Sequence, residues 1–416
     1  MLGVVGAMAA LSIDVVTLYT ARSEAQLAAD SAALAGARAL ANSGMTSDAS
    51  GGLTAAAEVG ATAVATQVAT QNQVGGRNLV AAEVVVSFAG NTTNPLVTVR
   101  VQRTDLPTFF ARIWGTRQLT VAASATAEAY NPSGADALGL VPIPVAPICV
   151  KPWLLPNIDP SGGGTIFDTT PTNSGAITNA GLLGWTTPAD PVGPAPNLMR
   201  LHAACIDCTT LPPPTAGVWQ YYPGNTATTF PPPTQALPSC TPPLTPAYQK
   251  SVAGCIQTPI ACNSTAMIDI SDYSARSIET AQGVNCLTHA AADRGDTVDS
   301  PSPPTAPFEF IAGADNPIAA VDPSFAGQEL MVSDSLVTVP VFNSVSGTPP
   351  FNPVTIIGFV QLFLNPDGAQ TPTTGPNTGY VKTTVINMAG CGTSAAGPPI
   401  FGNGASPVAV RLVSPP

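Results

Sequence analysis

The start of the chain constrains its fold most strongly, because the first 43 residues contain no proline and are dominated by alanine and other small or apolar residues. Alanine and leucine lose little on entering a helix, whereas proline breaks one. Asn42 and Gly44 follow, and residues of these types commonly stop a helix. The sequence therefore predicts one continuous helix from the N-terminus to about residue 43.

The first part of this helix has the composition of a membrane anchor. Met1–Ile13 carries no charge, although a membrane span needs about 20 apolar residues. Asp14 interrupts the run, and Tyr19 followed by Arg22 is the order expected where a helix leaves a bilayer. We expect residues 1–19 to form a partial transmembrane anchor. The alternatives are a buried helix of a soluble protein and a cleaved signal peptide, whose usual basic leader is missing here.

The second part of the helix presents a stripe of small residues. They recur at spacings of three and four, so they share one helix face, and their size lets another backbone approach closely. The members of this predicted packing face are Ala25, Ala28, Ala29, Ala32, Ala33 and Gly36. The face packs either against its own domain alone or also against a partner subunit.

The stretch from Leu11 to Leu40 resembles the opening of TadE/TadG-like Flp (Tad) pilus-assembly proteins. The matching features are Asp14, Tyr19, Arg22 and a Q-x-A-A-D-x-A-A-L-A-G-A core over Gln26–Ala37. The resemblance covers about a tenth of the chain. It implies a bacterial cell-envelope protein that works with other pilus-assembly proteins. Family members usually begin with a basic cluster and a longer apolar run, so we expect the anchor either to be completed upstream or to have been lost.

Residues 20–132 are predicted to form an α+β region with the outline of a pilin. A second helix is expected from Leu53 to about Asn72. Three strands are expected over Ala82–Phe88, Leu96–Thr104 and Leu119–Ala129, and Leu106–Trp114 has helical spacing. The second strand alternates valine with polar residues, which predicts one buried and one wet face. The expected fold of this region is α+β, with the long N-terminal membrane-anchor helix packed on a small antiparallel sheet.

After residue 132 the composition changes. The chain contains 37 glycines and 44 prolines, and only 9% of it is charged. Residues 133–330 are predicted to be Pro/Cys-rich and dominated by loops, because proline removes a backbone donor and holds the chain extended. Strand signals return in residues 331–416, over Ser335–Phe342, Pro353–Leu364, Gly379–Met388 and Val408–Val413, with a turn at Asn365–Gly368. We expect these two regions to form one loop-rich, mainly β C-terminal domain.

The eight cysteines all follow residue 132 and indicate an oxidising compartment. An even number of cysteines within a Pro-, Thr- and Ser-rich region favours disulfides, and reduced structural thiols are the alternative. The disulfide candidates are Cys149, Cys205, Cys208, Cys240, Cys255, Cys262, Cys286 and Cys391. Full pairing allows about 105 connectivities, so the sequence assigns none.

Few residues are available for catalysis or for binding metals and cofactors. His202, Cys205 and Cys208 could supply three zinc ligands, but no second C-x-x-C pair or nearby histidine completes the set. Asp269, Ser271 and Ser274 have one residue too many for the D-x-S-x-S metal loop of von Willebrand A-type domains. No nucleotide-binding or hydrolase motif is present, and Gly162–Gly164 is a lone glycine run. We expect no enzyme activity, no cofactor and no metal.

A net charge of −11 with no basic run argues against a nucleic-acid partner. The first hypothesis is a non-enzymatic, single-pass protein of the cytoplasmic membrane that helps to assemble or anchor a Tad/Flp-type pilus. Most of the chain would then lie outside the cytoplasm, as periplasmic or cell-surface structure, with other pilus-assembly or envelope proteins as partners. The alternative is a secreted or surface-tethered, adhesin-like binding module. A third hypothesis, an extracytoplasmic hydrolase, lacks a visible acid and base.

Overall fold

The computed structural model describes residues 2–108, 110, 111, 115, 118–134, 142–160, 164–170, 174–185, 199–201, 219–235, 237, 240, 241, 243–270, 275–299, 304–344, 352–392, 397–401 and 406–413. Two compact units divide the chain, and each draws on separate stretches of it. Unit 1 consists of Met1–Ala41, Thr54–Tyr130 and Val410–Pro416. Unit 2 consists of Asn42–Leu53 and Asn131–Ala409. The protein therefore mixes helix and sheet, with an N-terminal helix and a mainly β C-terminal region.

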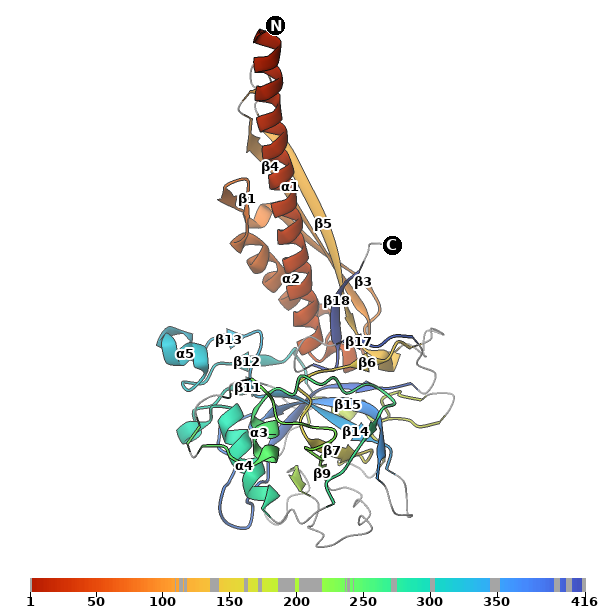
Figure 1. The fold of residues 1–416 in the computed structure, drawn as a ribbon. Helices are drawn as coiled ribbons and strands as arrows, with labels where there is room; N and C mark the ends of the chain where they lie inside the picture. Colours follow the sequence, from red (N-terminus) through yellow and green to blue (C-terminus); the bar gives the residue numbers. More distant parts are fainter. Residues whose placement is uncertain are drawn as a thin grey trace. The chain divides into compact units, whose positions relative to one another are not determined.

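Unit 1 contains two helices and a four-stranded sheet. The helices are α1 (Leu2–Asn42) and α2 (Thr54–Gln71), and a short hairpin of β1 (Gln73–Val74) and β2 (Arg77–Asn78) follows α2. The sheet has the order β18-β5-β4-β3, with β3 at Val84–Gly90, β4 at Pro95–Pro107, β5 at Gln118–Tyr130 and β18 at Ala409–Val413. In Figure 1, β4 and β5 run alongside α1, and the N-terminal end of α1 continues past the strands.

The sheet of unit 1 has one buried face, as the alternation of valines predicts. Val97, Val99 and Val101 in β4 are fully buried. The opposite face is polar, and Thr98 in β4 hydrogen-bonds across to Thr126 in β5 at 2.9 Å. The second helix and the three strands agree with the sequence prediction to within a few residues at their ends.

Two parts of unit 1 differ from the prediction. Leu106 and Pro107 belong to β4, which continues after a register shift between Arg103 and Leu106, so the helix expected over Leu106–Trp114 does not begin there. Phe109 and residues 112–114 lie outside the described residues. The last strand, β18, is paired with β5 of unit 1 rather than with the C-terminal sheet.

Within the described residues, no helix has both the length and the apolar character that a membrane crossing requires. The transmembrane anchor predicted for residues 1–19 is therefore not confirmed. Ser12, Asp14 and Thr17 lie within this part of α1 and interrupt its apolar run.

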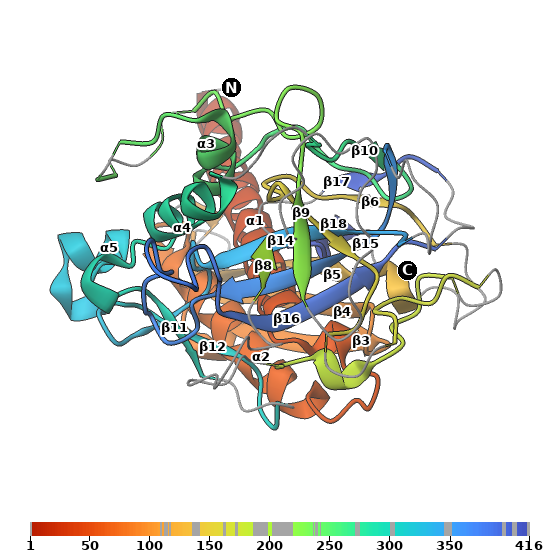
Figure 2. The same ribbon diagram turned by 90° about the horizontal axis from the view of Figure 1, so that it is seen from below.

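Unit 2 is organised around a seven-stranded sheet (Figure 2). Its central strands are β14 (Leu336–Phe342), β15 (Val354–Leu364) and β16 (Thr383–Gly390), and both β14 and β16 pair antiparallel with β15. The path continues from β14 through β7 (Trp153–Pro156) and β9 (Gln220–Pro223) to β8 (Arg200–Leu201), and β10 (Thr265–Ala266) flanks β15. The three central strands lie where the sequence predicts them, because each is a long apolar run rich in β-branched residues.

Short elements complete unit 2. The remaining strands are β6 (Val145–Ala146), β11 (Thr297–Asp299), β12 (Glu309–Ile311), β13 (Glu329–Leu330) and β17 (Ile400–Phe401). The helices are α3 (Ala247–Ala253), α4 (Arg276–Leu287) and α5 (Pro317–Val321). The predicted turn after β15 is present, because the amide of Gly368 donates to the carbonyl of Asn365 at 2.8 Å and both residues have positive φ.

Large aromatic side chains fill the core of unit 2. Trp153, Trp219 and Tyr221 are almost completely buried, as are Phe359 and Phe363. Trp153 and Tyr221 have ring centroids 5.7 Å apart. Such rings bury much apolar surface per residue. The Pro-rich middle of the chain, where it is described, is therefore packed structure rather than a linker.

Candidate interaction site on the first helix

The predicted packing face of α1 lies inside unit 1. Ala25 is 1% exposed, and Ala28, Ala29, Ala32 and Ala33 are fully buried. A Cβ atom on Gly36 would lie 3.1 Å from Cγ1 of Val97 and 3.3 Å from the Cβ of Ala65, so α1, α2 and the sheet meet there almost backbone to backbone. Four alanines on α2, at Ala57, Ala61, Ala65 and Ala69, are buried as well. The small-residue stripe therefore faces its own unit, and this face is not open to a partner subunit.

The opposite face of α1 is exposed and carries large apolar side chains, with exposed polar residues such as Ser12 and Ser23 between them. Tyr19 is 70% exposed, Val16 is 64% exposed and Leu27 is 65% exposed. Leu11, Ile13 and Val15 are also large exposed apolar residues. Single exposed apolar residues are normal on a protein surface, but a group along one helix marks an interaction site. The members of this group between residues 11 and 19, Leu11, Ile13, Val15, Val16 and Tyr19, are called the α1 apolar surface below.

Asp14, the one acidic residue between Leu11 and Tyr19, is buried rather than exposed. Its carboxylate accepts hydrogen bonds from the backbone amides of Phe110 and Ala111, at 3.0 and 2.7 Å. Phe110 and Ala111 lie in the connection from β4 to β5, and Asp14 shares a small cleft with Leu106 and Leu119 at the ends of these two strands. The name β4–β5 tip is used below for the described residues of this region, which are Leu106, Pro107, Thr108, Phe110, Ala111 and Leu119. Asp14 thus joins the strand tip to α1. The sequence marks Asp14 only as an isolated acid in an apolar run, which gives no indication of its partner.

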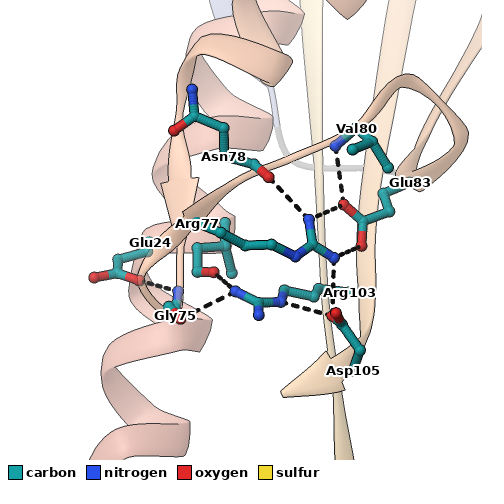
Figure 3. A network of polar contacts seen from close by, with 9 residues as sticks. Glu24, Gly75, Arg77, Asn78, Val80, Glu83, Arg103 and Asp105 are labelled. Carbon is teal, nitrogen blue, oxygen red and sulfur yellow. Dashed lines mark hydrogen bonds and ion pairs between the residues drawn. The ribbon is translucent and has the colours of Figure 1, made fainter. Parts of the chain in front are cut away.

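A polar network joins the β1–β2 hairpin to α1 and to β4 (Figure 3). The amide of Gly75 donates to Glu24 on α1 at 2.6 Å. The guanidinium of Arg103 on β4 donates to the carbonyls of Val74 and Gly75 and to the carboxylate of Asp105. Arg77 completes the network.

Arg77 bridges two carboxylates within this network. Its guanidinium donates to Glu83 at 2.6 Å and to Asp105 at 2.8 Å. Hydrogen bonds from Arg103 and Arg77 lower the pKa of Asp105 to about 2. The hydrogen bond from Arg77 also lowers the pKa of Glu83, and these two carboxylates raise the pKa of Arg77. All these groups are charged near neutral pH, so the network fixes the position of α1 beside the sheet.

The described cysteines all form disulfides within unit 2. The pairs are Cys149–Cys255, Cys240–Cys286 and Cys262–Cys391. They join positions 106, 46 and 129 residues apart in sequence. Cys205 and Cys208 lie outside the described residues. The connectivity was not accessible from the sequence, because all three pairs are long-range.

Of the residues considered for metal chemistry, only Asp269 lies in the described part of the chain. Asp269 pairs with Arg276 at 3.3 Å. Ser271, Ser274 and His202 lie outside the described residues, as do Gly162 and Gly163. Nε2 of His289 lies 3.2 Å from Oδ2 of Asp334. Among the described residues, no group of three His, Cys, Asp or Glu side chains could hold a metal ion.

Unit 2 also contains two polar features that the sequence does not reveal. A cavity of about 720 Å³ lies beside the Cys240–Cys286 disulfide, and Gln282, Asn285 and His289 are among its lining residues. Lys151 is buried, and its ammonium donates to the carbonyls of Val252 and Gly254 at 2.8 Å each. Burial lowers the pKa of Lys151 to about 7. Because Lys151 is engaged by backbone carbonyls and lies away from the cavity lining, we assign it a structural role.

The N-terminal part of the chain is similar to a known protein family. Residues 1–39 match the family model described as "Putative Flp pilus-assembly TadE/G-like". Neither a curated protein nor a solved structure matches the chain. The match covers most of α1, including the packing face, Asp14 and the α1 apolar surface.

Proposed function

We propose that the chain is a non-enzymatic, membrane-tethered envelope protein that takes part in assembling or anchoring a Tad/Flp-type pilus. The observation that carries this proposal is the family match over residues 1–39, which coincides with a single structural element, α1. The resemblance noted from the residues alone falls on the same positions.

The structure of α1 supports a tethering and docking role. Its small residues pack within unit 1, and the α1 apolar surface faces outward. Exposed apolar surface concentrated on one element suits a partner or a lipid phase, and it is costly in water. The partners expected from the family are other pilus-assembly proteins.

The disulfides of unit 2 support an extracytoplasmic location for the bulk of the chain. Three bonds form among the described cysteines. Disulfides persist in the periplasm and at cell surfaces, whereas cytosolic reductants keep thiols reduced. We therefore place unit 2 outside the cytoplasm and the N-terminal end of α1 in or at the cytoplasmic membrane.

Deletion of the gene in its native host tests the role in pilus assembly. We expect surface pili, counted by electron microscopy, to be lost and to return when the wild-type gene is supplied on a plasmid. Intact pili combined with reduced adherence would instead support the adhesin-like alternative and contradict this proposal.

A reporter fused after Pro416 tests the location. An enzyme that is active only in the periplasm, such as alkaline phosphatase, is expected to be active in the fusion. A matched fusion to a reporter that works only in the cytoplasm is expected to be inactive, and activity of that second fusion would refute the proposed topology.

A further inference from the structure

The α1 apolar surface is too wide to be the docking face for a single helix. Successive residues of an α-helix are rotated by about 100°, so Leu11, Ile13, Val15, Val16 and Tyr19 fan over an arc of about 200°. A helix that packs on one neighbour shows an apolar stripe roughly 100° wide, whereas a helix that is apolar nearly all round is surrounded by protein or by lipid. All five side chains are large and exposed in this structure.

The rest of the circumference at this level is closed by the β4–β5 tip. Asp14 is 6% exposed and accepts the amides of Phe110 and Ala111. Thr17 and Leu18 line the same small cleft as Leu106, Pro107 and Leu119. The strand tip therefore lies at the same height along α1 as the exposed apolar residues, on the opposite side of the helix.

The polar groups at this level are satisfied within the protein, as they must be in a lipid phase. The hydroxyl of Thr17 donates to the carbonyl of Ile13 at 2.9 Å, and that of Thr20 donates to the carbonyl of Val16 at 3.0 Å. The carboxyl oxygen Oδ2 of Asp14 accepts hydrogen bonds from two backbone amides. Groups without water need such internal partners, because leaving them unpaired in hydrocarbon costs several kcal/mol each.

The charged residues along α1 indicate where its contact with lipid ends. After Asp14, the next charged residue is Arg22, which is exposed, and Glu24 is already part of the polar network of Figure 3. A tyrosine followed by an arginine suits the headgroup region, since the aromatic ring is amphipathic and the cation is attracted to phosphate. The surface is also continuous with the uncharged run Met1–Ile13.

We propose that the β4–β5 tip is a second membrane contact, held against α1 by Asp14, so that the bilayer interface lies near Tyr19–Arg22 rather than at Asp14. The ligand of this surface is a phospholipid bilayer interface. Two elements then enter the interface side by side, the helix and the strand tip, with Phe110 facing lipid. This inference rests on the membrane tether of the proposed function and adds the tip to it.

Photocrosslinking in vesicles tests this arrangement on the full chain. A benzophenone-bearing amino acid replaces Val16, Phe110 or Val85, and each protein is reconstituted into phosphatidylethanolamine–phosphatidylglycerol vesicles and irradiated. Lipid adducts are then quantified by mass spectrometry. Val85 is the matched control because it is 60% exposed in the same unit, yet it pairs with Arg100, six residues before Leu106 and thus about 20 Å from the tip.

We expect adducts at positions 16 and 110 in at least roughly fivefold excess over position 85. Adducts at 16 without adducts at 110 would overturn the role of the tip and leave the membrane tether standing. Adducts at neither position would contradict both this inference and the tether.

A second variant tests the part played by Asp14. Asp14→Ala removes the acceptor for the amides of Phe110 and Ala111. We expect adducts at position 110 to fall several-fold while those at position 16 remain. Unchanged adducts at 110 would show that Asp14 does not hold the tip at the membrane.

Discussion

The two units are stabilised by different means although they belong to one chain. Unit 1 has no cysteine, and its core is built from alanine on two helices and valine on a sheet. Unit 2 has all eight cysteines and a core of large aromatic rings. Close approach of backbones stabilises unit 1 through many short contacts, while covalent links and aromatic burial stabilise unit 2. The stability of unit 1 should therefore depend most on the size of its buried side chains, and that of unit 2 on whether its cysteines are oxidised.

The largest expected effect is the loss of a long-range disulfide from unit 2. Cys391→Ser opens the link to Cys262, which joins positions 129 residues apart. Chain entropy alone predicts a destabilisation of about 4 to 5 kcal/mol for a loop of that order. Denaturant unfolding followed by tryptophan fluorescence measures it, because three of the four tryptophans, Trp153, Trp185 and Trp219, lie in unit 2.

The same variant tests whether the two units unfold independently of each other. Helical circular dichroism reports largely on α1 and α2, the two longest helices described. We expect that signal to keep its transition when the disulfide is lost. A helical transition that shifts as far as the fluorescence transition would show that the two units unfold as one.

The next largest effect is expected from enlarging the packing face in unit 1. Gly36→Leu forces a side chain into the space occupied by Val97 and Ala65. Overpacking of this kind costs about 1 to 3 kcal/mol. Gly60→Leu is the matched control, because no atom apart from the neighbouring backbone of α2 lies within 4 Å of a Cβ at Gly60, and leucine favours a helix over glycine.

Thermal unfolding by circular dichroism compares these two variants. The midpoint temperature of unfolding is expected to fall for Gly36→Leu and to stay unchanged or rise slightly for Gly60→Leu. Equal behaviour of the two variants would mean that α1 does not pack closely in solution.

The smallest effect concerns pH and the polar network of unit 1. The folded-state pKa values of Asp105 and Glu83 are lowered, so their contribution to stability is present above the unfolded pKa of about 4 and is lost as the pH falls toward about 2. Because Asp105 is well exposed, solvent screening limits each pair to less than about 1 kcal/mol.

A pH series of unfolding curves checks this prediction. Asp105→Asn should reduce the acid-dependent part of the unfolding free energy of unit 1, whereas Glu58→Gln, outside the network, should leave it unchanged. An identical pH profile for wild type and Asp105→Asn would show that the polar network does not contribute to the pH dependence of stability.

Local patterns predicted much of both units. Alanine-rich, proline-free runs marked α1 and α2, and the alternation or runs of β-branched residues marked β3, β4, β5, β14, β15 and β16. These elements are encoded by spacing within a few residues, which is visible in one sequence.

The structural features that were not predicted depend on contacts between residues far apart in the sequence. Nothing in Ala409–Val413 itself indicates that β18 pairs with β5, some 280 residues earlier in the chain. Asn42–Leu53 belongs to unit 2 although helices of unit 1 flank it, and there the hydroxyl of Ser47 donates to the carbonyl of Met388 at 3.0 Å. The hydrogen bonds of Asp14 and the three disulfides also join residues that lie far apart in the sequence. For the candidate site, the sequence located α1 and its small-residue face, and the structure showed which way that face points.

The role in pilus assembly is tested most directly by the amount of pilin that can be sheared from the surface of cells lacking this gene. We expect surface pilin to be lost in the deletion strain and to be restored by the wild-type gene or by Gly60→Leu, but poorly by Gly36→Leu. Surface pilin at the wild-type level in the deletion strain itself would contradict a role in pilus assembly.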